Sequence, residues 1–231
     1  ISIPSFVIKI CNKVFYKCSK LTIILIPLSV TSIENEAFSG CISLESIDIP
    51  FSVKSIDSGA FCECYSLKQI NIPNLNCIDE VVFKECYSLE YILIPSSVVS
   101  IKEGAFFGCK SLKSIKIPSS VTLIDCEAFA ECESLTEITI PTSVVCIGEN
   151  AFEDCISLTK ITFENPSSVS TIGNRCFYGC SSLHEILIPS SVSSIGNYVF
   201  EKCESLNKIS IPSSLNFDDI GVTNNNIVIK Y

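Results

Sequence analysis

The chain has 231 residues, a formal net charge of −9 and an isoelectric point near 4.7. This acidic balance disfavours nucleic acid and anionic lipid surfaces as partners, because both attract basic patches. Every apolar run is short and is interrupted by proline or polar residues, well below the roughly 20 residues that span a bilayer. We therefore expect no membrane insertion within this chain.

One repeat fills nearly the whole chain. Numbered from its cysteine, it reads C-x-S-L-x-x-I-x-I-P-x-S-V-x-x-I-x-x-x-A-F-x-x, and a fixed period of this length is typical of solenoids. The repeat starts at Cys18, Cys41, Cys64, Cys86, Cys109, Cys132, Cys155, Cys180 and Cys203. The spacing is 23 residues, except for 22 after Cys64 and 25 after Cys155, where Glu164 and Asn165 are inserted. We interpret both exceptions as changes in loop length.

The chain begins inside a repeat, because Ile3 and Phe15 occupy late positions of the unit and lead into Cys18. We therefore expect a fragment or a processed product of a longer protein. Residues 1–215 should form one solenoid domain, with eight complete repeats and a partial repeat at each end. The tail, residues 216–231, leaves the pattern and is expected to be an irregular C-terminal cap or a truncated segment.

The first half of each unit, L-x-x-I-x-I-P, predicts a short parallel strand with inward side chains two residues apart. In the repeat that starts at Cys132, Ile138 and Ile140 would face the core. All ten prolines of the chain close this segment. Proline has no N–H and a fixed φ, so it ends a hydrogen-bonded ladder.

The second half, S-V-x-x-I-x-x-x-A-F, spaces its apolar positions by three, four and one. This spacing predicts a turn, a short extended piece and a single helical turn. Stacked units would bury one another's apolar faces, with Phe129 and its equivalents between the coils. The sequence thus predicts a right-handed solenoid with a parallel β-sheet on the concave side and short extended or helical turns on the convex side.

The nine cysteines at position 1 predict a ladder of small buried thiols. Adjacent coils lie about 4.8 Å apart, so neighbouring thiols are also close enough to form disulfides. The other six cysteines do not stack, and the only close pair, Cys62 and Cys64, lacks the C-x-x-C spacing of a zinc site. We expect no metal and no cofactor.

Nothing in the sequence indicates catalysis. The chain has a single histidine, His184, but no G-x-S-x-G or similar motif with a nucleophile that a histidine could activate. It also has no phosphate-binding glycine loop. Most carboxylates occupy the variable convex positions, where solvation explains them. We therefore expect a protein that is not an enzyme.

Residues 180–201, CSSLHEILIPSSVSSIGNYVFE, show the repeat almost without deviation. This pattern resembles the BspA-like class of leucine-rich repeats, and the resemblance covers residues 1 to about 215. It implies a surface or secreted protein that binds host proteins or cells. The high cysteine content is closer to the protist members of that class than to the bacterial ones.

The concave side offers a candidate binding surface. Tyr91 and Leu93 are apolar side chains at strand positions expected to face solvent, and tyrosines are common binding anchors. The full predicted set is Tyr91, Leu93, Tyr65, Tyr87, Lys68, Glu90 and Lys113. The alternative interpretation is scattered surface hydrophobics, with alternating charges that fix the strand register. Ile23 and Leu25 form a second candidate.

These features favour a non-enzymatic adhesive domain on the cell surface or secreted, with an extracellular-matrix or host-cell protein as its ligand. An intracellular, cytoplasmic scaffold for protein interactions is the alternative, because the cysteine ladder and the lack of N-x-S/T sequons would suit it.

Overall fold

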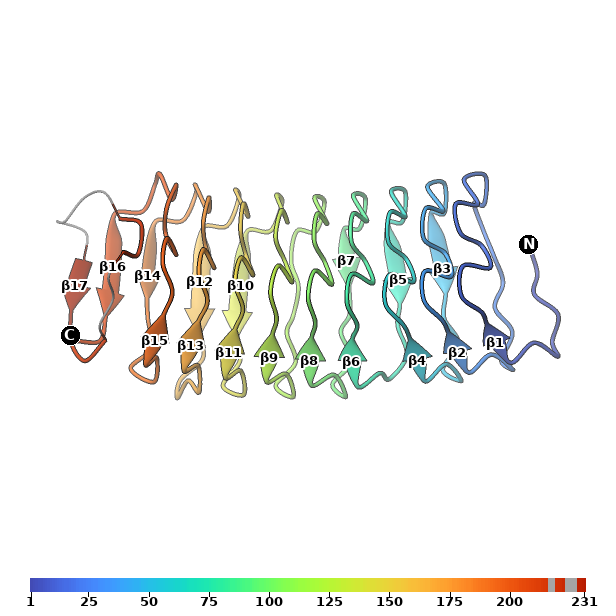
Figure 1. The fold of residues 1–231 in the computed structure, drawn as a ribbon, viewed down its shortest axis with the longest axis horizontal. Coiled ribbons are helices and arrows are strands. Elements are labelled where there is room, and N and C mark those ends of the chain that lie inside the picture. Colours follow the sequence, from blue (N-terminus) through green and yellow to red (C-terminus); the bar gives the residue numbers. More distant parts are fainter. Residues whose placement is uncertain (216–218, 223–227) are drawn as a thin grey trace.

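A computed structural model describes residues 1–215, 219–222 and 228–231. In it the chain winds into a solenoid of about nine turns, with the two ladders of short strands that Figure 1 shows along its length. Every strand pairing in the described part is parallel, and those between repeats join equivalent repeat positions, as in Glu137 with Lys160. The predicted solenoid is therefore confirmed.

The first ladder forms where the I-x-I-P segments stack. Its strands are β3 (Ser46–Asp48), β5 (Gln69–Asn71), β7 (Tyr91–Ile92), β10 (Glu137–Ile140), β12 (Lys160–Phe163), β14 (Glu185–Leu187), β16 (Lys208–Ile211) and β17 (Val228–Lys230). Ile138 and Ile140 are buried as predicted, and most coils turn at the proline, as at Pro141, whose carbonyl accepts a hydrogen bond from the N–H of Val144.

The second ladder is formed by positions 15 and 16 of each coil. Its strands are β1 (Lys9–Ile10), β2 (Ser32–Ile33), β4 (Ser55–Ile56), β6 (Cys77–Ile78), β8 (Ser100–Ile101), β9 (Leu123–Ile124), β11 (Cys146–Ile147), β13 (Thr171–Ile172) and β15 (Ser194–Ile195). These strands are the extended piece that the second half of the repeat predicts.

The helical turn expected before each cysteine does not form in the described part of the chain. Two residues per coil, at positions 19 and 23, adopt a left-handed backbone, as in Glu127 (φ 54°) and Glu131 (φ 56°). The N–H groups of Glu127, Phe129 and Glu131 also donate to carbonyls of the next coil at 2.7–2.9 Å. A right-handed helix needs those donors within its own turn, so it cannot continue here.

A stack of phenylalanine rings fills the core on the cysteine side. Nine rings, from Phe15 to Phe200, lie nearly parallel with centroids 5.1 to 5.9 Å apart. The rings from Phe38 to Phe200 are buried, which confirms the inward orientation expected for Phe129. Offset stacks of this kind stabilise a core beyond the burial of their area.

The position-1 cysteines form a ladder of free thiols. From Cys41 to Cys203, each Sγ donates to the phenylalanine carbonyl one coil earlier at 3.1–3.3 Å. Burial raises the pKa of the Cys155 thiol to about 12. The sequence allowed either free thiols or disulfides between neighbouring coils, and the structure contains free thiols. Each hydrogen bond gives a partner to both the buried thiol and the buried carbonyl.

Among the described residues, the first ladder is interrupted in two places, because the coil of residues 109–131 has no strand between β7 and β10 and no strand pairing links β12 to β14. The joint between the coils of β12 and β14 also lacks a backbone hydrogen bond at position 5. At position 5 the N–H of Thr159 donates to Thr136, and that of Asn207 donates to His184, both at 2.9 Å. No such bond joins His184 to Thr159 within residues 1–215, and no strand pairing links β12 to β14. The two inserted residues lie in the intervening coil and lengthen its path to the proline turn. We call this joint the seam.

The end of the chain continues the coil where it is described. Tyr198 and Phe200 donate their N–H groups to Asp219 and Ile220, and β17 pairs with β16. Residues 216–218 and 223–227 lie outside the described residues, so the expected boundary at residue 215 stays a prediction.

Candidate protein-binding face

The concave strands present every second side chain to solvent. Positions 6 and 8 alternate with the buried isoleucine of position 7, as the exposed, buried, exposed pattern of β3, β5 and β14 shows. This alternation follows from the strand period of two. The repeat therefore builds a regular grid of exposed side chains on rigid strands.

Tyr91 and Leu93 are the apolar members of this grid in its central part. Their side chains are 56% and 59% exposed, on either side of the buried Ile92. Tyr91 lies in register with Gln69 on β5. Both predicted anchors thus face solvent from one edge of the β3, β5 and β7 sheet.

The charges predicted around Tyr91 form two ion pairs. Lys68 lies 3.0 Å from Glu45, and Lys113 lies 2.8 Å from Glu90. The hydrogen bond from Lys113 lowers the pKa of the Glu90 carboxyl. Exposed pairs of this kind contribute little stability, although they do favour the observed register.

Tyr65 and Tyr87 form a separate group at position 2, the corner before the strand. Their rings stack at 4.8 Å, and the Tyr87 hydroxyl donates to Glu85 at 2.7 Å. This hydrogen bond is the main cause of the raised pKa of Tyr87, and burial of the ring is the second. Both rings are only partly exposed. The corner pair is therefore packed within its own network, whereas Tyr91 and Leu93 are free to contact a partner.

Sequence reasoning gave little weight to the C-terminal part of the same face. An open hollow there is lined by Thr159, Lys160, His184, Glu185, Asn207 and Lys208. His184 is exposed, as expected, and Glu185 lies 3.7 Å from Lys208. The common repeat positions of these residues, 5 and 6, were visible in the sequence, but the hollow that they line was not.

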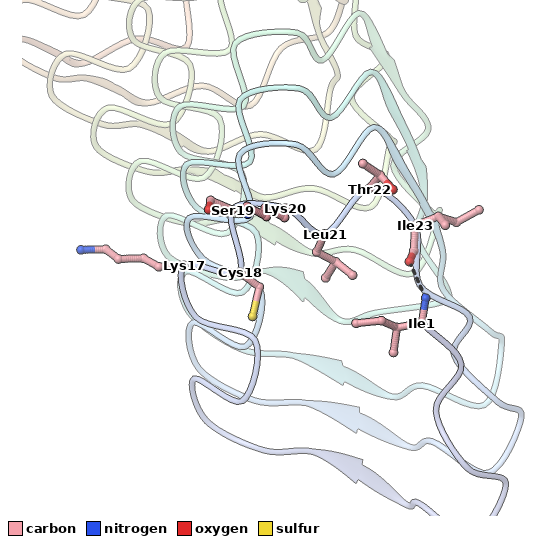
Figure 2. Close-up of a pocket in the computed structure, with 8 residues that line it drawn as sticks. All are labelled: Ile1, Lys17, Cys18, Ser19, Lys20, Leu21, Thr22 and Ile23. Carbon is pink, nitrogen blue, oxygen red and sulfur yellow. Dashed lines mark hydrogen bonds between the residues drawn. The ribbon is translucent and has the colours of Figure 1, made fainter.

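A second hollow lies at the first coil, lined by residues that include Ile1, Cys18, Leu21 and Ile23, and Figure 2 shows Ile1 beside Ile23. The N-terminal amine donates to the carbonyl of Ile23 at 3.1 Å.

The described residues contain no group of three or more histidine, cysteine, aspartate or glutamate side chains placed to hold a metal ion. A search of the same residues also finds no helix long and apolar enough to span a membrane.

The sequence matches the family described as BspA type Leucine rich repeat region over residues 1–113 and 99–224. The chain belongs to the BspA-type leucine-rich-repeat family. The resemblance seen in the repeat is therefore confirmed, and the family is one of repeat proteins that are typically non-enzymatic.

Two solved leucine-rich-repeat structures are similar to this BspA-type chain. One is a leucine-rich repeat protein from Bacteroides ovatus, with 25% identity and a TM-score of 0.61, which covers 100% of this chain and 77% of that one. The other is a leucine rich cell surface protein from Faecalibacterium prausnitzii, with 28% identity and a TM-score of 0.52, covering 99% and 77%. A search of curated proteins finds no match.

Proposed function

We propose that this domain is a non-enzymatic adhesive module, on the cell surface or secreted, that binds an extracellular-matrix or host-cell protein through its concave face. The repeat family favours protein interaction as the general role. Similarity to a leucine rich cell surface protein supports the location.

The observation that carries the proposal is the exposed pair of Tyr91 and Leu93 on rigid strands. Binding energy in protein interfaces concentrates in a few aromatic and apolar anchors, surrounded by contacts that exclude water. The ion pairs of Lys68 and Lys113 flank this pair and would adjust association rates and salt dependence. Tyr65 and Tyr87 would contact the ligand at the rim of the interface.

The test measures binding of the wild type and of a Tyr91→Ala, Leu93→Ala double variant to purified matrix proteins, beginning with fibronectin, laminin and collagen. We expect at least a tenfold loss of affinity in the double variant. A matched control, Val99→Ala with Val145→Ala, removes two exposed apolar side chains elsewhere and should bind as the wild type does. Equal binding by the folded double variant would place the anchor elsewhere.

An intracellular scaffold is the second candidate, and the fifteen free thiols favour it. Mass spectrometry of the native protein after alkylation under denaturing conditions separates the two. Disulfides among the more accessible cysteines, such as Cys11 and Cys62, would indicate an exported protein, whereas fully alkylated thiols would favour the scaffold.

A further inference from the structure

The first coils carry large apolar side chains at the tips of their proline turns. In each turn the N–H of the valine donates to the proline carbonyl, as from Val30 to Pro27 and from Val53 to Pro50 at 3.0–3.1 Å. Leu28 and Phe51 follow these prolines at position 11, and their side chains are 66% and 76% exposed. Tight turns point such side chains away from the core.

The same position is small and polar in the later coils. There it holds Asn74, Ser96, Ser119, Thr142, Ser167, Ser190 and Ser213. The turn of the first coil also carries Phe6, at the next position, with 81% of its side chain exposed. The apolar tips are thus confined to one end of the solenoid and are not required by the repeat.

The whole edge made by the proline turns is almost free of charge. This edge is the lower one in Figure 1, where the strands of the second ladder begin. Among the five residues that start at each proline, the described part of the chain has a single charged side chain, Lys54. Its Nζ donates to the carbonyl of Phe51 at 3.2 Å, directly beside the apolar tip. Glu164, just before Pro166, lies five coils away from Phe51.

Most of the 25 carboxylate residues lie between the second ladder and the next cysteine, on the other edge. Glu63, Glu85, Glu131 and Asp154 all occupy the left-handed position before the cysteine, for example. The molecule therefore has one acidic edge and one uncharged edge, and the uncharged edge ends in the apolar tips. The net charge of −9 alone does not show that the charged residues are concentrated on one edge.

We propose that the turn-tip patch of Phe6, Leu28 and Phe51 docks the solenoid peripherally on a zwitterionic lipid bilayer. The apolar tips enter the headgroup boundary, where binding strength scales with the apolar area buried. Lys54 remains at the interface with its apolar stem buried and its ammonium in water. The acidic edge points away from the membrane.

A lipid surface suits this patch better than a protein does. The three side chains project from separate turns and not from one sheet, and Lys54 is the single charged residue of these three turns, so the patch lacks the charged rim that is common around protein interfaces. Tyr91 and Leu93, by contrast, lie on the concave face, where about nine stacked coils provide a long continuous surface for a protein partner. Lipid docking is independent of the proposed protein binding.

The test measures cosedimentation with phosphatidylcholine vesicles. We expect the wild type to bind and a Leu28→Ser, Phe51→Ser double variant to bind at least about tenfold more weakly, because it loses the apolar area at both tips. Serine at position 11 is already accommodated in five later coils, so this variant should fold, which far-ultraviolet circular dichroism will verify. The control, Ile42→Ser with Ile156→Ser, removes two exposed apolar side chains at position 2, on the opposite edge, and should bind as the wild type does.

Two further measurements distinguish the outcomes. Vesicles with 30% phosphatidylglycerol should bind the wild type more weakly, because the protein is acidic overall. The chain has no tryptophan, so Phe51→Trp provides a single reporter, and its emission should shift to the blue on adding phosphatidylcholine vesicles, unlike that of Ile156→Trp on the opposite edge. No vesicle binding by the wild type, or equal binding by the folded double variant, would overturn the proposal.

Discussion

Each residue type in the repeat has a position-specific physical task. The phenylalanine stacks, the cysteine donates to a carbonyl one coil away, and the residues at positions 19 and 23 turn the backbone left-handed. Leucine or methionine could fill the volume of the phenylalanine but would not form the ring stack. The consensus therefore follows from the contacts between neighbouring coils more than from local preference.

Phe129→Ala should lower the free energy of unfolding by about 3 to 5 kcal/mol, because it leaves a cavity between two stacked rings in a fully buried site. Denaturant melts measure this loss. Val145→Ala, at an exposed position, serves as the control. A loss below about 1 kcal/mol for Phe129→Ala would contradict the ring stack as a source of stability.

Glu131→Gly should raise the stability by about 0.5 to 1 kcal/mol, since the left-handed conformation strains any residue with a Cβ. Gly40, Gly108 and Gly179 already occupy this position with φ of 69–72°. The exposed ion pair of Glu131 with Lys110, at 3.9 Å, offsets little of the gain. Thermal melts of the variant test the effect, and a lowered melting temperature would refute it.

At the scale of the element, the sequence predicted strands better than turns. Isoleucines two residues apart and a proline at the end specify the concave strand. The sequence therefore predicted directly that the Ile138 side chain faces the core. The apolar spacing before each cysteine fits a helical turn equally well, and Glu127 gives no sign that its φ is positive. The network of Tyr87 with Tyr65 and Glu85 depends on the stacking of neighbouring coils, which no single repeat encodes.

The thiol ladder predicts a loss of stability at alkaline pH. An unfolded cysteine releases its proton near pH 9, whereas burial raises the pKa of Cys41 to about 11 and that of Cys155 to about 12. Above pH 9 the folded state thus binds more protons than the unfolded state, and the free energy of unfolding falls as the pH rises towards 11 to 12. Each thiol contributes up to about 1.4 kcal/mol per pH unit there.

Urea melts at pH 7, 9 and 10.5 measure this effect. Full stability is expected at pH 7, where the thiols are protonated in both states. A Cys109→Ala, Cys132→Ala variant should show a shallower decline above pH 9 than the wild type. If both proteins lose stability with the same slope, other groups control the alkaline transition.

At the scale of the whole molecule, stability comes from the interfaces between neighbouring coils. Each inner coil covers its apolar faces only with the coils on either side, as the continuous phenylalanine stack shows. Residues 86–131, two coils cut from the middle, should therefore show no cooperative melt by circular dichroism. A longer piece, residues 41–179, keeps four further interfaces and should melt cooperatively. A sharp transition in the two-coil piece would show that a single interface suffices.

The seam between β12 and β14 also makes the solenoid an uneven rod. A rod bends most easily where its cross-section is weakest. At the seam the concave side has no strand pairing between β12 and β14, whereas the phenylalanine stack continues from Phe152 to Phe177. Bending at the seam would use the intact core as its pivot and would open or close the concave side. A ligand that grips the concave face on both sides of the seam would therefore change the curvature of the rod, and its two ends would move as levers.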